Sequence, residues 1–336
     1  MSNWLLAEIS AQLRLGQPLA LPTHLQVEPT NRCNLRCLVC PTVTGEMKRA
    51  RGDMLATHFE RLMDEVGESL LLLLLWEWGE PFLNAGLCDL IAAAKRHGVK
   101  VVTSTNGHFV QSRARAREVI ESGLDTLVFA LDGVTGESYQ KYRRGGKFNR
   151  VLSSIRILTE TKWTLRAISP LVVLQFIVLR HNEVEIEPAI DLARTLGVDV
   201  LTFRTANPYH REFEATYLPE DPRYRQFEYV PGTNDRKRKP NTCKRFWNMP
   251  AVQWDGRVSH CEFDVNGEFE LGNAFHSSLA EIWRGHRYRM ARQAFATHRP
   301  ITRPCRECIY NFSSVHDIVA QAVPISAAAR CAGVGK

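Results

Sequence analysis

The sequence lacks any apolar run long enough to cross a bilayer. Its longest aliphatic stretch, residues 70–75, is far shorter than the roughly 20 residues that a membrane helix needs. The opening residues, MSNWLLAEISAQLRLGQ, have an amphipathic helical rhythm and lack the basic-then-apolar order of a signal peptide. These absences predict a cytoplasmic protein that does not associate with a membrane.

Internal repeats and recognisable nucleic-acid-binding modules are also missing. The formal net charge of +7 would suit nucleic acid, an anionic substrate or an acidic protein partner. Without a known module to organise the positive charge, we expect no nucleic-acid partner. A chain of 336 residues with 44% hydrophobic residues can build one large core and a smaller appended module. The composition is therefore that of a globular enzyme.

A β-strand and α-helix rhythm runs through the first two thirds of the chain. Nearly continuous aliphatic strands separated by helices indicate a parallel sheet covered by helices. The number of units predicts an α/β fold, a partial (β/α)6 barrel of parallel strands, whose chemistry lies at the carboxyl ends of the strands. The six apolar runs are residues 25–30, 69–76, 99–107, 124–133, 169–179 and 198–206.

The rhythm stops near residue 206, where a segment rich in proline, charge and aromatic residues begins. We expect an N-terminal helix in residues 1–24, the barrel in 25–206 and a bridge in 207–240. A small domain with a β-hairpin turning at Asp255 and Gly256 should follow in 241–312. Residues 313–336 are expected to form a C-terminal helix and tail.

The loop after the first predicted strand carries three cysteines, Cys33, Cys37 and Cys40. Because the cytosol disfavours disulfides, nine cysteines in such a chain suggest metal or redox chemistry. A structural zinc site uses four protein ligands. A cubane iron–sulfur cluster held by three thiolates would instead leave one iron open to a small chelating molecule. Zinc binding or incidental clustering is the alternative.

This CxxxCxxC spacing, together with WEWGEP at residues 76–81, resembles the radical S-adenosylmethionine (SAM) superfamily. The resemblance implies that the open iron binds SAM, and that one electron from the cluster cleaves SAM to a 5′-deoxyadenosyl radical. It assigns Glu80, beside Gly79, to the amino group of SAM, whereas Trp78 replaces a glycine of the family motif. Such cofactors carry the hard chemistry, and the protein positions them.

Further SAM contacts follow from the same resemblance. Asp132 matches the fourth-strand motif on the ribose side, although the serine of that motif is absent. Arg143 matches an arginine that pairs with the SAM carboxylate, which suits its forked guanidinium. Thr105 and Asn106 are expected nucleoside contacts, and a role in the turn before Gly107 is the alternative.

A second cysteine set lies in the C-terminal part: Cys243, Cys261, Cys305 and Cys308. Their order around a hairpin and a helix resembles the Twitch module, the shortened form of the SPASM domain. The resemblance implies a second, auxiliary [4Fe–4S] cluster with no open iron, and a four-cysteine zinc site is the alternative. Cys88 and Cys331 are expected to bind nothing.

Substrate residues are predicted from strand alternation, because residues two apart share a face. Glu28 and Arg204 are expected to face the barrel lumen as base and anionic-group anchor, with pairing to one another as the alternative. Tyr209 and His210, just beyond the sixth strand, could supply an acid or a base. A surface role is the alternative for His210.

The resemblance extends to antibiotic-pathway aminocyclitol dehydrogenases and cytosylglucuronate-type decarboxylases. It implies dehydrogenation or decarboxylation of a polar small molecule such as a sugar, aminocyclitol or sugar nucleoside. The alternative enzyme is a maturase of a ribosomally made peptide, which usually has a longer N-terminal extension. A zinc-ribbon nucleic-acid binder would make the strand-end motifs accidental. The basic run of residues 235–245 predicts docking of a flavodoxin-type electron donor.

Overall fold

The computed structural model describes residues 2–205, 213–233, 235–297, 303–306, 308–313 and 321–324. The chain divides into two compact units, each assembled from segments far apart in the sequence. Unit 1 comprises residues 1–33, 45–103 and 238–312, and unit 2 comprises residues 34–44, 104–237 and 313–336. The C-terminal cysteine segment therefore belongs to the same unit as the first strands.

The strands of unit 1 follow the spatial order β3-β2-β1-β7-β8-β9. β1 pairs in parallel with β2 on one side and with β7 on the other, so the C-terminal hairpin extends the parallel sheet. β7, β8 and β9 pair antiparallel. Their bounds are β1 His24–Val27, β2 Leu72–Leu74, β3 Lys100–Thr105, β7 Ala251–Val252, β8 Arg257–Ser259 and β9 Gly272–Asn273.

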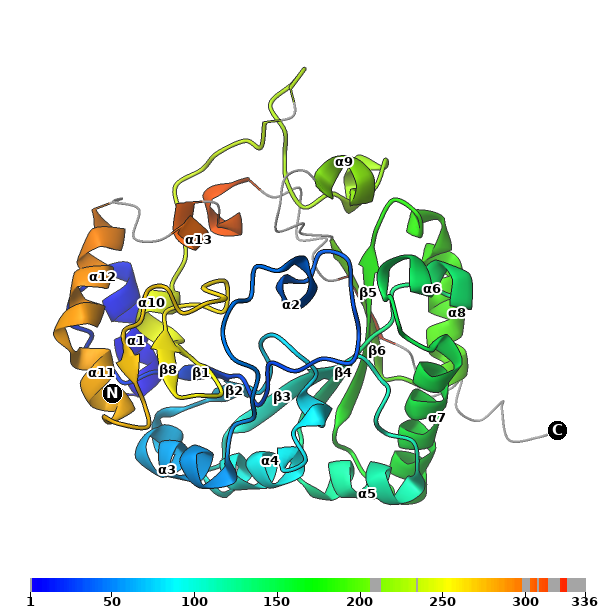
Figure 1. The fold of residues 1–336 in the computed structure, drawn as a ribbon, viewed down its shortest axis with the longest axis horizontal. Helices are drawn as coiled ribbons and strands as arrows, with labels where there is room; N and C mark the ends of the chain where they lie inside the picture. The colour runs from blue at the N-terminus through cyan, green and yellow to red at the C-terminus, as the bar shows by residue number, and fades with distance from the viewer. Residues whose placement is uncertain are drawn as a thin grey trace. The chain divides into compact units, whose positions relative to one another are not determined.

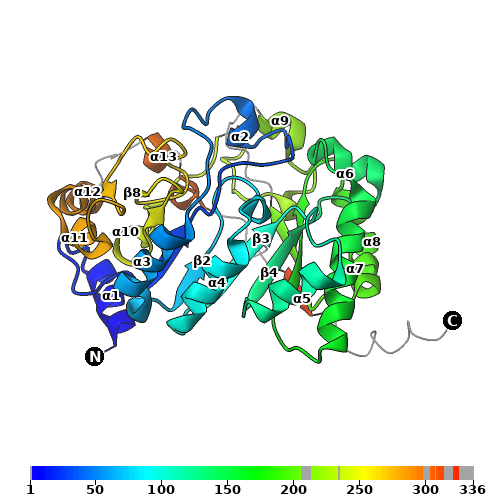
Figure 2. The same cartoon turned by 60° about the horizontal axis from the view of Figure 1, so that its bottom comes forward.

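Helices cover this sheet and bury its aliphatic side chains. α3 and α4 pack against one another and lie along β1 and β2 (Figures 1 and 2). α1 packs against α10, and α11 packs against both α3 and α12. Leu25, Leu73 and Phe59 are fully buried in this core. The helices are α1 Asn3–Gln12, α3 Ala56–Val66, α4 Leu87–Arg96, α10 Arg245–Asn248, α11 Leu279–Arg284, α12 His286–Ala296 and α13 Arg303–Arg306.

The strands of unit 2 follow the order β10-β6-β5-β4. β4, β5 and β6 are parallel, whereas β10 pairs antiparallel with β6. The aliphatic and aromatic side chains that these strands bury include Leu127, Phe176 and Leu201. The bounds are β4 Thr126–Ala130, β5 Leu171–Val178, β6 Val200–Thr205 and β10 Gln321–Pro324.

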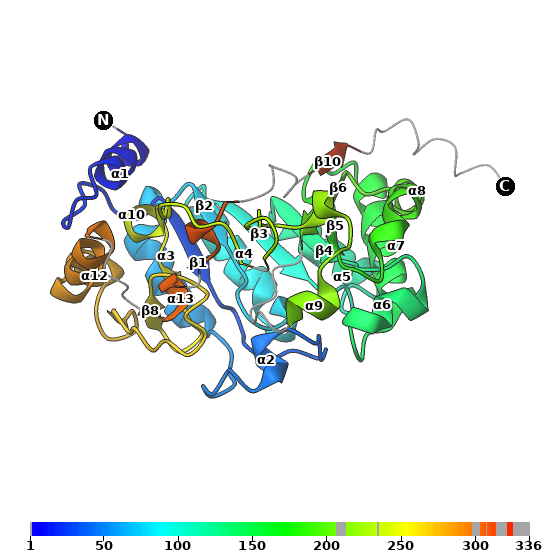
Figure 3. The same cartoon turned by 90° about the horizontal axis from the view of Figure 1, so that it is seen from above.

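The helices of unit 2 flank β4–β6, as Figure 3 shows for α7 and α8 beside β5 and β6. α8 ends at Gly197, whose positive φ of 66° is the left-handed cap that glycine allows at least cost. The helices are α2 Pro41–Thr44, α5 Arg113–Glu121, α6 Gly136–Tyr142, α7 Phe148–Thr164, α8 Ile186–Leu196 and α9 Glu214–Tyr217.

The predicted α/β class is confirmed, and each of the six expected apolar runs contains a parallel strand, β1 to β6. The expected hairpin forms on either side of Asp255 and Gly256. The prediction of a C-terminal helix is wrong for residues 321–324, because they form strand β10 on the edge of β6. Among the described residues, no helix is long and apolar enough to cross a membrane.

Candidate functional site

Two of the predicted SAM contacts in unit 2, Asp132 and Arg143, are bonded to one another. Arg143 Nε donates to Asp132 Oδ2 at 2.5 Å, and its Nη1 lies 3.7 Å from Cys37 Sγ. Asp132 follows β4 and is fully buried, and its Oδ1 accepts from the backbone N–H of Ile177 at 2.7 Å. The structure thus brings the thiol of Cys37, a carboxylate and a guanidinium together at the carboxyl end of β4.

Burial and the neighbouring Arg143 act on the pKa of the Cys37 thiol in opposite directions. Burial raises the pKa of the Cys37 thiol, the positive charge of Arg143 opposes that effect, and the nearby Cys40 adds to it. A backbone hydrogen bond from Cys40 N to Cys37 O, 3.1 Å long, closes a turn between them. Arg143 is therefore placed to favour the deprotonated form that iron binding requires.

Thr105 and Asn106 lie at the carboxyl end of β3, and both are buried. Thr105 Oγ1 accepts from the N–H of Gly107 at 3.0 Å, which is the turn role foreseen as the alternative. Asn106 Nδ2 donates to Asn34 Oδ1 at 2.8 Å. The Nδ1 of His108, 2.9 Å from Asn106 Oδ1, donates to it because Nε2 of the same ring accepts from Lys147 N. The amide of Asn106 is therefore fixed in one orientation.

In unit 1 the Gly79–Glu80 turn packs against the start of the cysteine loop. Gly79 has φ +116°, and a Cβ there would lie 2.6 Å from the Thr30 carbonyl oxygen. Glu80 is 1% exposed, and its N–H donates to Arg32 O at 2.8 Å, immediately before Cys33. Glu80 Oε1 accepts from Phe82 N at 3.2 Å. Glycine is required at position 79 because two backbones meet there.

Trp78, which replaces a glycine of the family motif, reaches the auxiliary cysteine loop. Its Nε1 donates to the carbonyl oxygen of Glu262 at 2.8 Å, directly after Cys261. The indole therefore anchors the loop after Cys261 to the residues that follow β2.

The four C-terminal cysteines of unit 1 influence one another electrostatically. Burial, followed by smaller contributions from Cys308 and Cys305, raises the pKa of Cys243 to about 12. Burial and the neighbouring Cys305 raise the pKa of Cys308 to about 11. Burial also raises the pKa of Cys261, to which Glu262 and Cys243 contribute. Such mutual effects require short separations.

This donor set fits an iron–sulfur cluster, because four cysteine thiols that influence one another's pKa are the kind of ligands that a cubane uses. None of these four cysteines forms a disulfide. In the described part of the chain, no three His, Cys, Asp or Glu side chains stand at metal-binding spacing. The fit accordingly rests on the donor chemistry and on the mutual influence of the thiols.

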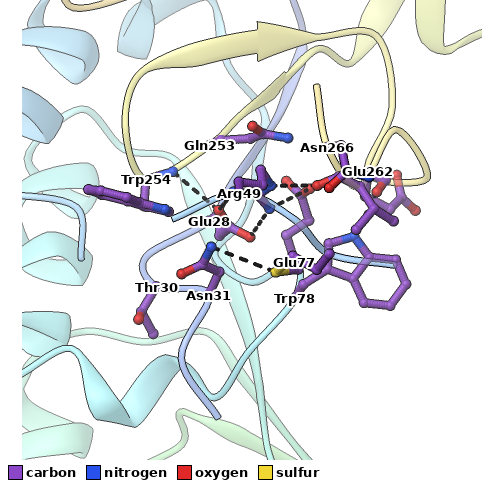
Figure 4. Close-up of polar contacts among 12 residues, drawn as sticks. Glu28, Thr30, Asn31, Arg49, Glu77, Trp78, Gln253, Trp254, Glu262 and Asn266 are labelled. Carbon is purple, nitrogen blue, oxygen red and sulfur yellow. Dashed lines mark hydrogen bonds and ion pairs between the residues drawn. The ribbon is translucent and has the colours of Figure 1, made fainter. Parts of the chain in front are cut away.

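Glu28, a predicted catalytic residue, lies at the end of β1 with its side chain fully buried. Its two oxygens accept from Arg49 Nη1 and Nη2 at 2.7 and 2.6 Å. A third contact comes from the backbone N–H of Trp254 at 3.3 Å. Figure 4 shows the pair between the hairpin and the residues after β2. The partner of Glu28 is thus a residue that strand alternation did not single out.

The remaining predicted substrate residues lie in or beyond β6. Arg204 is exposed near the end of that strand, whereas Tyr209 and His210 lie outside the described residues. The basic run carries less free charge than expected, because Arg236 is buried and pairs with Glu214. Lys237 pairs with Glu228 at 3.0 Å.

Sequence reasoning missed Arg49, Glu77 and Glu262. Arg49 and Glu77 are buried side chains of one charged cluster, which also involves Glu28. Glu262 pairs with Arg245, whose Nη2 donates to Glu262 Oε1 at 2.8 Å. The one available signal was Glu77, a charged residue between two tryptophans directly before the GEP motif.

Two protein-family models match this chain, one in its N-terminal part and one in its C-terminal part. Residues 27–193 match the Radical SAM superfamily, and residues 243–309 match SPASM, an iron-sulfur cluster-binding domain. The first carries a [4Fe–4S] cluster and SAM, and the second carries an auxiliary cluster, as the two cysteine sets predict.

Several curated proteins are similar to the chain at 24% identity. The antilisterial bacteriocin subtilosin biosynthesis protein AlbA of Bacillus subtilis matches 78% of this chain, which spans only 60% of that relative. A second relative is the tungsten-containing aldehyde ferredoxin oxidoreductase cofactor-modifying protein of Pyrococcus furiosus. The match covers 85% of this chain and 86% of that relative. The match to the PqqA peptide cyclase of Granulibacter bethesdensis covers 85% of this chain and 79% of that cyclase.

Solved structures share the fold. Streptococcus suis SuiB superposes with a TM-score of 0.61 at 13% identity, covering 81% of this chain and 68% of SuiB. BtrN in complex with AdoMet and 2-DOIA superposes with a TM-score of 0.50 at 17% identity. The superposition covers 82% of this chain and 87% of BtrN. At these identities the likeness establishes the architecture, a partial barrel with a small C-terminal domain.

Proposed function

The chain carries a radical SAM domain followed by a SPASM iron–sulfur cluster-binding domain, and from that premise we propose that this radical SAM enzyme modifies a peptide. The observation that carries the proposal is the similarity to the PqqA peptide cyclase, which spans 85% of this chain and 79% of that protein. The similarity to a bacteriocin biosynthesis protein points the same way. The peptide maturase, rather than the sugar-type enzyme, is therefore the leading candidate.

When bound, the first cluster and SAM supply a 5′-deoxyadenosyl radical that takes a hydrogen atom from the substrate. The chain's own residues hold the reactants in place. Arg143 would bind the SAM carboxylate from its position beside Asp132 and Cys37, and Glu80 would bind the amino group. Asn106, fixed by His108 and Asn34, would face the nucleoside. Positioning of this kind is the protein's main contribution in cofactor enzymes.

The test is anaerobic turnover with short peptides encoded beside the gene. Reconstituted enzyme, SAM and a reductant should convert one such peptide to a product that has lost hydrogen, as read by mass spectrometry. The same peptide should stimulate formation of 5′-deoxyadenosine. The Cys33, Cys37 and Cys40 to Ala variant is the control and should do neither. If none of these peptides is altered or stimulates SAM cleavage, the peptide proposal fails.

A polar small molecule is the second candidate, favoured by a hydrogen-bonded set of polar side chains in unit 1. Gln26 on β1 accepts from Arg245 Nη1 at 3.1 Å, and Arg245 also holds Glu262. One similar protein is named for modifying a cofactor. A sugar, aminocyclitol or sugar nucleoside would then undergo dehydrogenation or decarboxylation, with Arg204 anchoring an anionic group. In that case Arg204→Lys should impair substrate turnover far more than uncoupled SAM cleavage.

A further inference from the structure

A clasp of hydrogen bonds joins the segment after the three-cysteine loop to the loop that follows Cys261. Arg49 Nε donates to the carbonyl oxygen of Val265. The N–H of Lys48 donates to Asn266 Oδ1 at 2.8 Å, and Asn266 Nδ2 donates back to Glu46 O at 2.8 Å. Three hydrogen bonds therefore tie residues 46–49 to residues 265–266, which are more than 200 positions away in the sequence.

The guanidinium of Arg49 donates hydrogen bonds to two residues. Besides Val265, it forms a two-pronged pair with Glu28, with both N···O distances below 2.8 Å. The side chains of Arg49 and Glu28 are 1% and 0% exposed. Paired, hydrogen-bonded charges of this geometry are the ones that tolerate burial. Burial raises the pKa of Glu28, and the two hydrogen bonds and the charge of Arg49 oppose that effect, so Glu28 is the carboxyl group that Arg49 directly stabilises in its charged form.

Glu77 approaches the same guanidinium but accepts no hydrogen bond from it. Its side chain is 0% exposed, and its Oε1 lies 4.0 Å from Arg49 Nη2, beyond hydrogen-bond reach. Neither oxygen of Glu77 has a hydrogen-bond donor among the described residues. Figure 4 shows Glu77 on the far side of Arg49 from Trp254.

The charges that face Glu77 are mostly negative. Burial raises its pKa well above the ordinary value of 4.5, and the charge of Glu28 adds to that effect. Arg49 opposes them, while Glu262 and Asp264 from the auxiliary loop raise the pKa further. Glu262 is itself paired with Arg245 of α10. A second buried carboxylate sharing one guanidinium would carry an uncompensated charge.

We propose that the folded chain holds Glu77 as a neutral carboxylic acid, and that loss of its proton loosens the Arg49 clasp on the loop after Cys261. An ionised Glu77 would compete with Glu28 and Val265 for the guanidinium, because the single Arg49 cannot serve all three. The proton on Glu77 thereby decides how firmly the two loops are joined. This inference does not depend on which substrate the enzyme modifies.

The sign of the pH dependence follows from the neutral acid. Between pH 4.5 and the higher pH at which Glu77 ionises in the folded chain, only the unfolded chain has released this proton. The free energy of unfolding therefore falls as pH rises through that window. Glu77→Gln keeps the shape, removes the titration and should melt at a higher temperature than wild type, with a gap that widens as pH rises.

The direct test is infrared difference spectroscopy of the full-length protein. The wild-type minus Glu77→Gln spectrum at neutral pH should contain the carbonyl stretch of a protonated carboxylic acid, and the band should shift in D2O. Absence of that band would overturn the proposal. Glu28→Gln is the matched variant, because it frees Arg49 to pair with Glu77. Its spectrum should lose the same band as Glu77 ionises, and persistence of the band would also count against the proposal.

Hydrogen exchange followed by mass spectrometry tests the clasp itself. After correction for the intrinsic rate, protection of the peptide containing residues 264–269 should fall as pH rises in wild type. In Glu77→Gln the corrected protection should stay constant with pH. Equal pH dependence in both proteins would show that Glu77 does not control the clasp.

Discussion

At the scale of single residues, the turn at Gly79 leaves no room for a side chain. A Cβ at position 79 would lie 2.6 Å from Thr30 O and 2.8 Å from Arg32 O, and the backbone has φ +116°. Because strain and a backbone clash combine, we expect Gly79→Ala to lower the free energy of unfolding by about 2–4 kcal/mol. Urea denaturation of the apo chain measures it.

Gly45→Ala is the matched control. Gly45 also has a positive φ, +83°, yet a Cβ there would meet nothing within 4 Å. Gly45→Ala should lower the free energy of unfolding only through backbone strain, by about 1 kcal/mol. Equal losses in the two variants would show that the contact of Gly79 with the cysteine loop contributes nothing.

The Asp132–Arg143 pair is a second prediction at this scale. The Asp132 side chain is 0% exposed and the Arg143 side chain is 14% exposed. Removing one of them therefore leaves the other as a buried charge without its ion-pair partner. A double-mutant cycle of Asp132→Asn and Arg143→Gln should give a coupling energy of about 1–3 kcal/mol in unfolding. Calorimetric titration should show that Arg143→Gln also weakens SAM binding. Additive effects on stability would mean that the pair does not act as a unit.

At the scale of secondary structure elements, the sequence predicts features that neighbouring residues determine, and it does not predict contacts between residues far apart in the chain. The strands, the hairpin at Asp255 and the cysteine spacings are all encoded within a few neighbouring residues, so pattern and turn chemistry reveal them. The Glu28–Arg49 pair joins residues 21 positions apart, and no periodicity selects that arginine. The clasp to Asn266 spans 218 positions. Contacts of this kind depend on tertiary packing.

Strand β10 illustrates the same limit and yields a prediction. Residues 321–324 pair antiparallel with β6, although the neighbouring alanines favour a helix by propensity. β10 covers the outer edge of β6, and uncovered edges pair with other chains. Truncation after Ser313 should therefore increase self-association, seen as earlier elution in size-exclusion chromatography. Unchanged elution at high protein concentration would contradict this role for β10.

At the scale of the whole molecule, we propose that surface charge guides electron delivery. Arg236 does not belong to the proposed docking run, because it is buried with Glu214. Lys239 is exposed, and we propose that it helps to dock a flavodoxin-type donor. Lys239→Glu should slow flavodoxin-driven turnover and flatten its decline with added salt. Turnover driven by a chemical reductant is the control and should not change. An unaltered salt dependence would exclude this docking position.

The two cofactor sites lead to the last prediction, which concerns metal content. Each [4Fe–4S] cluster contributes four irons, so the anaerobically reconstituted chain should bind about eight. Replacing Cys33, Cys37 and Cys40 by alanine should remove about half of the iron and abolish SAM cleavage. Replacing Cys305 and Cys308 should remove the other half and leave the first cluster able to bind SAM, because Cys37 lies with Arg143 and Asp132 in unit 2. Iron analysis with Mössbauer spectroscopy distinguishes these states. Stoichiometric zinc without iron at the four C-terminal cysteines would contradict the auxiliary cluster and would leave the chain with a structural metal site there.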